Sequence, residues 1–116
     1  MRVHLDTSAL VDALTGPRRS LDGLVALAEA GHRLSISSLV LSEWLRGPRT
    51  RAELVAQEEL FPREAAVGFG AAEASLAARL YGQVRRPRGR AIDLAIAACA
   101  LIDDASLWSL NRGDFD

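Results

Sequence analysis

The sequence has one cysteine, no lysine and no long apolar run. Cys99 excludes an internal disulfide, and beside His4 and His32 it gives no Cys/His zinc pattern, so we interpret it as a small core residue. The longest apolar stretch, 94–102, is far shorter than the roughly 20 residues that cross a bilayer. Residues 1–6 turn polar at once and predict no signal peptide. We therefore expect a cytoplasmic, soluble protein.

The size and composition are those of an ordinary globular domain. The chain has 116 residues, of which 49% are hydrophobic and 25% charged, so we expect one domain over residues 1–116. The net charge is −1, which does not indicate a nucleic-acid-binding protein. All 14 basic residues are arginine, the better residue for bidentate phosphate contacts, although genomic coding bias is the simpler explanation.

Helical and strand patterns alternate along the sequence. The predicted helices cover residues 9–14, 21–30, 38–46, 50–60, 71–84 and 91–105. The predicted strands cover residues 3–5, 34–36, 65–69 and 107–110. This alternation favours an α/β fold in which a parallel sheet has helices on both faces. In such a fold, the ligand crevice lies at the carboxyl ends of the strands.

Acidic side chains occur in settings where apolar residues are expected. Asp93 precedes nine apolar residues, 94–102, which predict a helix that is buried all round. Glu43 lies in another mostly apolar helix, Asp6 ends the first strand, and Asp114 follows the last strand. An unpaired buried carboxylate costs several kcal/mol, so each of these acids needs a partner or a cavity.

Each acid also has a purely structural interpretation. Asp6 would serve as a helix N-cap, and Asp93 would favour the dipole of its helix from the first turn. Glu43 would belong to a narrow solvated stripe with Arg46, and Asp114 would belong to a turn. Because acids that meet in one crevice repel one another, a common site would require a cation, and all-oxygen ligation suits Mg²⁺ or Mn²⁺.

Four stretches in chain order carry a resemblance to a known family. They are residues 5–10 (LDTSAL), 36–47 (ISSLVLSEWLRG), 93–98 (DLAIAA) and 111–115 (NRGDF). With these motifs the chain resembles a PIN-domain ribonuclease, specifically the VapC-type toxin of a toxin–antitoxin pair. The resemblance covers nearly the whole chain.

The resemblance implies a PIN-like three-layer α/β fold, with a central parallel sheet of about four strands flanked by helices. It implies that the catalytic and metal-binding residues are Asp6, Glu43, Asp93 and Asp114. The supporting residues would be Thr7 or Ser8, which orient a carboxylate or water, and Asn111, which holds the turn of Asp114. Family members usually continue into a final edge strand after the Asp-Phe motif, and we expect this domain to lack that strand.

The activity implied by the resemblance is Mg²⁺- or Mn²⁺-dependent hydrolysis of RNA phosphodiester bonds. The implied partners are the RNA substrate, a small cognate antitoxin and a second copy in a homodimer. A basic loop just before the Asp93 helix is a candidate for holding the RNA backbone, and its members are Arg85, Arg86, Arg88 and Arg90. An ordinary solvated loop is an equal interpretation of this loop. Arg46 and Arg112 are weaker candidates.

Three alternative functions can be compared with the sequence. A phosphohydrolase of the haloacid dehalogenase type needs Asp-x-Asp after the first strand, whereas Thr7-Ser8 follows Asp6. A phospho-acceptor receiver domain relies on a lysine near its last strand, and this chain has none. A degenerate PIN domain that only binds a partner would lack an acid, yet all four acids are present.

Overall fold

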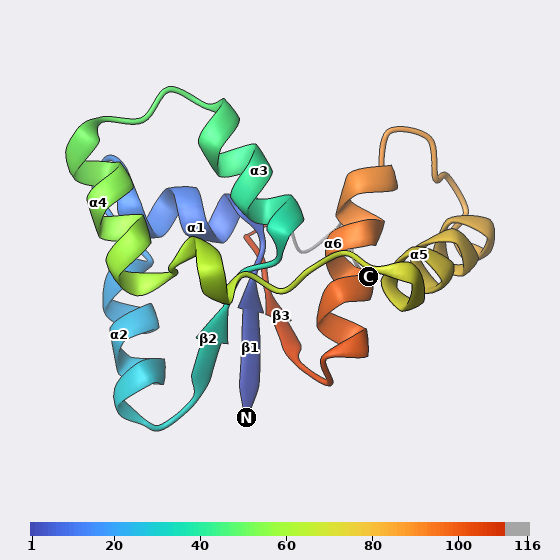
Figure 1. The fold of residues 1–116 in the computed structure, drawn as a ribbon, viewed down its shortest axis with the longest axis horizontal. Coiled ribbons are helices and arrows are strands. Elements are labelled where there is room, and N and C mark those ends of the chain that lie inside the picture. Colours follow the sequence, from blue (N-terminus) through green and yellow to red (C-terminus); the bar gives the residue numbers. More distant parts are fainter. Residues whose placement is uncertain (111–116) are drawn as a thin grey trace.

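A short parallel sheet forms the centre of the computed structural model, which describes residues 1–110 (Figure 1). Over this range the strands are β1 (Arg2–Leu5), β2 (Arg33–Ser35) and β3 (Ser106–Trp108), in the order β2-β1-β3. The central strand β1 pairs on both sides, since Val3 lies opposite both Leu34 and Ser106. The sheet thus joins segments from the two halves of the chain.

Helices connect the strands and cover the sheet on both sides. Those described are α1 (Thr7–Leu14), α2 (Leu21–Glu29), α3 (Ser38–Arg46), α4 (Arg51–Leu60), α5 (Ala71–Gln83) and α6 (Ala91–Ile102). In Figure 1, α1, α2 and α4 lie on one side of the sheet, and α5 and α6 lie on the other. α3 begins just beyond the carboxyl end of β2. This three-layer parallel α/β arrangement confirms the predicted fold class.

The core lies between the sheet and the first helices. Leu5, Leu10 and Trp44 are fully buried there, and the same cluster of buried residues includes Phe61 and, from α6, Ile96, at 3% and 2% exposure. Apolar residues three and four positions apart share one helix face, which is why α1 and α3 each bury one side in this core. In the described range, 1–110, no helix is both long and apolar enough to cross a membrane.

The prediction of a strand over residues 65–69 is wrong. Arg63–Ala65 form a single 3₁₀ turn, η1, and only Val67 then pairs, in one isolated parallel bridge with Ser37. Pro62 precedes the turn, and Gly68 and Gly70 follow the bridge, so few residues favour an extended ladder here. In the described residues the sheet therefore has three strands, and one bridge takes the place of the expected fourth.

The last helix differs from its prediction in length and burial. α6 ends at Ile102 instead of residue 105, because Asp103 caps it and Asp104 takes a positive φ of 53°. It buries one face, which includes Ile96 and Cys99, but Ile92 and Leu101 are about half exposed at 48% and 57%. The expectation of a helix buried on every side is thus wrong, and the α5–α6 hairpin leaves apolar side chains at the surface.

Candidate functional site

Asp6 lies at the junction of the central strand and the first helix. Its main-chain N–H donates to the Trp108 carbonyl oxygen over 3.1 Å, which ties the end of β1 to β3. Its side chain caps α1, because Oδ1 accepts a hydrogen bond from the Ala9 N–H over 2.9 Å. The residue is only 4% exposed. Asp6 is therefore the helix N-cap of the structural interpretation and also a buried carboxylate at the expected crevice.

Ser8 holds the same oxygen of Asp6. Its hydroxyl donates to Asp6 Oδ1 over 2.8 Å and accepts from the Leu110 N–H over 3.2 Å. Among the described residues, both donors to the Asp6 side chain thus use Oδ1, which leaves Oδ2 outside these hydrogen bonds. Ser8 also links this acid to the segment that follows β3.

Thr7 brings Glu43 to the same end of the sheet. The Thr7 hydroxyl donates to Glu43 Oε1 over 2.5 Å, so α3 is fixed to the first turn of α1. The second oxygen, Oε2, lies 3.5 Å from Arg46 Nη2, one turn further along α3. The Glu43 side chain is 27% exposed. The adjacent hydroxyls of Thr7 and Ser8 therefore each hold one oxygen of a different acid.

Asp93 lies in the first turn of α6 and is half-buried. This helix contacts α3 and β3, and its amino end lies at the same end of the molecule as the carboxyl ends of the strands (Figure 1). Within residues 1–110, no three side chains of His, Cys, Asp or Glu form a group that could hold a metal ion. The other predicted residues, Asp114, Asn111 and the weaker candidate Arg112, lie outside the described residues.

The predicted RNA-binding arginines differ in exposure. Arg85, Arg86 and Arg88 are exposed on the loop between α5 and α6. Arg90 is half-buried directly before α6, and its Nε is shielded from solvent without a hydrogen-bond partner among the described residues. Arg90 is thus the member of this group nearest in sequence to Asp93 and the least solvated.

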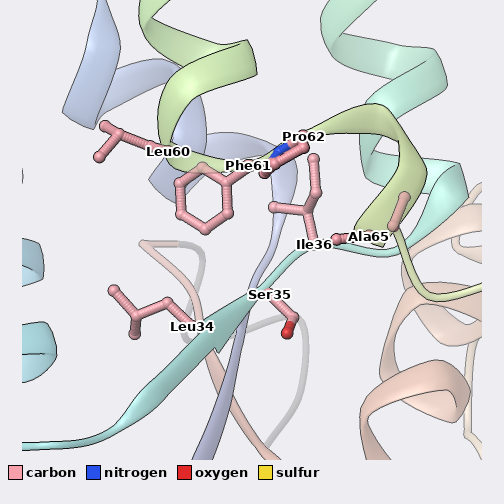
Figure 2. Close-up of a pocket in the computed structure, with 8 residues that line it drawn as sticks. Leu34, Ser35, Ile36, Leu60, Phe61, Pro62 and Ala65 are labelled. Atoms are coloured by element: carbon pink, nitrogen blue, oxygen red, sulfur yellow. The ribbon is translucent and has the colours of Figure 1, made fainter.

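Concave surfaces of the described residues also lie away from these four arginines. A depression of about 410 Å³ on the outer face of α3 is lined by Ser38, Leu41, Ser42, Leu45 and Arg46. A small cavity of about 30 Å³ lies between β2 and the end of α4, and Figure 2 shows Leu34, Ile36 and Phe61 around it. Its lining is largely apolar and includes none of the predicted acids.

Sequence reasoning missed one contact at the site and treated another only as an alternative to function. The Ser8 hydroxyl accepts from Leu110, more than 100 residues away, and no local pattern signals such a pair. The ion pair between Arg46 and Glu43 had a signal, because residues at i and i+3 lie on one helix face. The solvated-stripe interpretation of Glu43 included that pair, but it treated the pair as an alternative to function.

These features define a class of protein: a parallel α/β domain with acids at the carboxyl end of its central strand. Comparison with known proteins agrees with this class. Residues 3–115 match the family described as the PIN domain, so this chain belongs to the PIN-domain family. No match is found among curated proteins.

A solved structure with a similar fold is the crystal structure of VapBC2 from Rickettsia felis bound to a DNA fragment from their promoter. The TM-score is 0.73, and the alignment covers 97% of this chain and 90% of that chain. At 21% sequence identity, this similarity concerns the fold.

Proposed function

We propose that this chain is a divalent-metal-dependent endoribonuclease of the VapC type. PIN domains are generally nucleases and typically depend on a divalent metal ion. The observation that carries the proposal is the pair of adjacent hydroxyls, Thr7 and Ser8, each of which holds one oxygen of a different acid at the end of β1. A purely structural Asp6 would need only the Ala9 N–H as a capping partner.

The donor set fits Mg²⁺ or Mn²⁺. Carboxylate and hydroxyl oxygens are hard ligands, and the hydrogen bonds to Asp6 among the described residues leave Oδ2 for a cation. We assign the ligands to Asp6, Glu43, Asp93 and Asp114. Within residues 1–110 no three of these acids form a group that could hold a metal ion, and Asp114 lies outside the described residues, so the four-acid set stays a prediction.

The residues of the chain have distinct tasks in the proposed hydrolysis. A bound divalent ion supplies a water activated for attack on phosphorus and neutralises charge on the phosphate. Thr7 keeps the carboxylate of Glu43 in one orientation, and Ser8 does the same for Asp6. The arginines before α6 hold the RNA backbone through contacts that do not depend on base sequence.

The proposed partners follow from the same family. The Rickettsia felis structure is of VapBC2 on DNA, and we propose that a small cognate antitoxin binds and inhibits this chain as well. We also propose a homodimer. Co-expression with a candidate antitoxin gene product, followed by size-exclusion chromatography with light scattering, tests both assemblies.

Nuclease assays on matched aspartate variants test the activity. With Mn²⁺ and a structured RNA, wild-type protein should cleave, and Asp6→Asn or Asp93→Asn should not. Because loss of an outer-shell partner already costs about 10- to 100-fold, loss of a ligand should lower the rate by more than about 100-fold. Asp22→Asn makes the same chemical change at an exposed position on α2 and should keep full activity. Full cleavage by both site variants, or cleavage in excess EDTA, would reject the metal site.

A further inference from the structure

Arg46 occupies an oxygen that the proposed metal site needs. Its Nη2 lies 3.5 Å from Glu43 Oε2, while Thr7 takes Oε1, so the chain itself engages both oxygens of this carboxylate. By contrast, Asp6 keeps Oδ2 outside the hydrogen bonds of the described residues. A cation that binds Glu43 through Oε2 would therefore compete with the guanidinium of Arg46.

The hold of Arg46 on Glu43 is weak. The Arg46 side chain is 72% exposed, and an exposed ion pair of this kind contributes little to stability because solvent screens it. Arg49, three residues further on, is fixed much more firmly. Its guanidinium lies 4.2 Å from the centre of the Trp44 ring, and its Nε donates to the Trp44 carbonyl oxygen over 3.0 Å. Arg46 is thus free to change partner, whereas Arg49 is not.

A second surface lies within reach of Arg46. The depression of about 410 Å³ on α3 is lined by Arg46 itself, by the hydroxyl residues Ser38 and Ser42, and by Leu41 and Leu45. A guanidinium matches the geometry of phosphate, hydroxyls donate to phosphate or ribose oxygens, and leucines cover the apolar face of a sugar or base. This lining suits one nucleotide of an RNA chain beside Glu43.

We propose that Arg46 exchanges between two partners and thereby couples metal binding to RNA binding. Without a divalent ion, Arg46 neutralises Glu43. With the ion at Glu43, Arg46 is released and binds a phosphate of the RNA at the depression on α3. This inference rests on the proposed function and adds to it a substrate-binding residue that also competes with the metal ion.

The first test measures Mn²⁺ binding by isothermal titration calorimetry. Arg46→Gln should bind Mn²⁺ about 2- to 5-fold more tightly than wild type, the size expected for loss of an exposed competing ion pair. Arg51→Gln, a like change at an exposed position at the start of α4, should leave the affinity unchanged. In a Glu43→Gln background, Arg46→Gln should bring no gain. A gain that persists there would show a general charge effect and overturn the exchange.

The second test measures RNA binding by fluorescence anisotropy. The probe is a labelled 12-nucleotide RNA, with Ca²⁺ as a hard cation that fills carboxylate sites, and a denaturing gel verifies that the probe stays intact. With Ca²⁺, Arg46→Gln should bind the probe about 3- to 10-fold more weakly, and the slope of log K against log salt should fall by about 0.7. In EDTA the variant should match wild type, and Arg46→Lys should recover part of the affinity.

The outcomes separate this inference from the proposed function. If wild-type protein cleaves RNA and binds Mn²⁺ while Arg46→Gln behaves as Arg51→Gln does, the exchange is overturned and the nuclease stands. Equal loss of RNA affinity in Ca²⁺ and in EDTA would also overturn the exchange, since Arg46 would then bind RNA independently of the ion. If wild-type protein takes up no Mn²⁺, both proposals fall.

Discussion

The imidazole of His4 lies on the central strand and is almost fully buried, at 1% exposure. Its Nε2 donates to Asp103 Oδ2 over 2.8 Å, and Arg2 Nη1 lies 2.7 Å from the other oxygen of the same carboxylate. The hydrogen bond from His4 lowers the pKa of Asp103 below its ordinary value of 3.8, burial opposes this shift, and the charge of Arg2 supports it. The three residues join β1 to the end of α6.

This cluster predicts a specific acid sensitivity. Because the pKa of Asp103 is lower in the folded than in the unfolded chain, its ionised form stabilises the fold. That contribution is fully present above the unfolded pKa, 3.8, and is lost as the pH falls through the lower folded value. Asp103→Asn should reduce the free energy of unfolding by about 1–3 kcal/mol near neutral pH, since the buried His4 loses a charged partner.

Urea unfolding followed by circular dichroism between about pH 3 and pH 7 measures this effect. The wild-type protein should lose stability more steeply than Asp103→Asn at the acid end of the range. Asp104→Asn, which changes the neighbouring acid, serves as the control and should keep the wild-type slope. Parallel curves for wild type and Asp103→Asn would contradict the role assigned to the cluster.

The sequence predicted the environment of some single residues and not of others. Cys99 is buried as expected of a small hydrophobe, and burial raises the pKa of its thiol to about 11, so it stays protonated at neutral pH. The sequence places His4 within the predicted strand over residues 3–5 without indicating a partner, and it does not single out Asp103. Their contact joins residues 99 positions apart, and local patterns carry no information on such a pair.

At the scale of the element, α4 is the clearest case of a helix fixed by its first turn. Thr50 and Glu53 form a reciprocal capping box, in which Thr50 Oγ1 accepts from the Glu53 N–H over 3.1 Å and Glu53 Oε1 accepts from the Thr50 N–H over 2.8 Å. α4 buries only Gln57, so tertiary packing contributes little to holding its start. The capping box should therefore dominate the local stability of this helix.

Thr50→Ala should lower the free energy of unfolding by about 1 kcal/mol, because the Glu53 N–H loses its side-chain acceptor, Thr50 Oγ1. Equilibrium unfolding in urea measures the change. Glu53→Gln keeps an acceptor oxygen for the Thr50 N–H and should cost much less than the alanine variant. A Thr50→Ala protein as stable as wild type would show that α4 is held by its packing alone.

Elements with strong end signals were predicted within a few residues. Ser37 caps α3, Thr50 caps α4, and Gly31, with a φ of 92°, follows the end of α2. The prediction of a strand over residues 65–69 was wrong because the apolar residues there resemble a strand pattern. The glycines of this segment and the preceding proline allow only one bridge. The surface of α6 was misjudged because composition does not reveal which helix faces find a partner.

At the scale of the whole molecule, binding of a metal ion at the proposed site should stabilise the folded chain. Mn²⁺ that binds only the folded chain stabilises it by RT ln(1 + [Mn²⁺]/Kd), which is about 2.7 kcal/mol at a hundredfold excess over Kd. Thermal unfolding of wild type should therefore shift upward with Mn²⁺ concentration, and Asp6→Asn should remove the shift. Asp22→Asn should retain it. An equal shift in the Asp6→Asn protein would place Mn²⁺ elsewhere.

The site as a whole was only partly predictable. Sequence motifs predicted four acids, whose role as metal ligands stays a prediction, and the parallel fold explains why Asp6 lies at the carboxyl end of the central strand. Two hydrogen bonds at the site depend on how α1, α3 and β3 pack. They join the Thr7 hydroxyl to Glu43 and the Leu110 N–H to Ser8. Those contacts are set by tertiary structure, and the spacing of residues along the chain does not encode them.

The pairing of β1 with β3 has a consequence for biosynthesis. Val3 leaves the ribosome well before its neighbour on one side, Ser106, which is made about a hundred peptide bonds later. Closing so large a loop is entropically costly and slows folding. Until residue 108 emerges, the main-chain N–H of Asp6 has no Trp108 carbonyl to bind, so the nascent chain cannot complete the proposed active site.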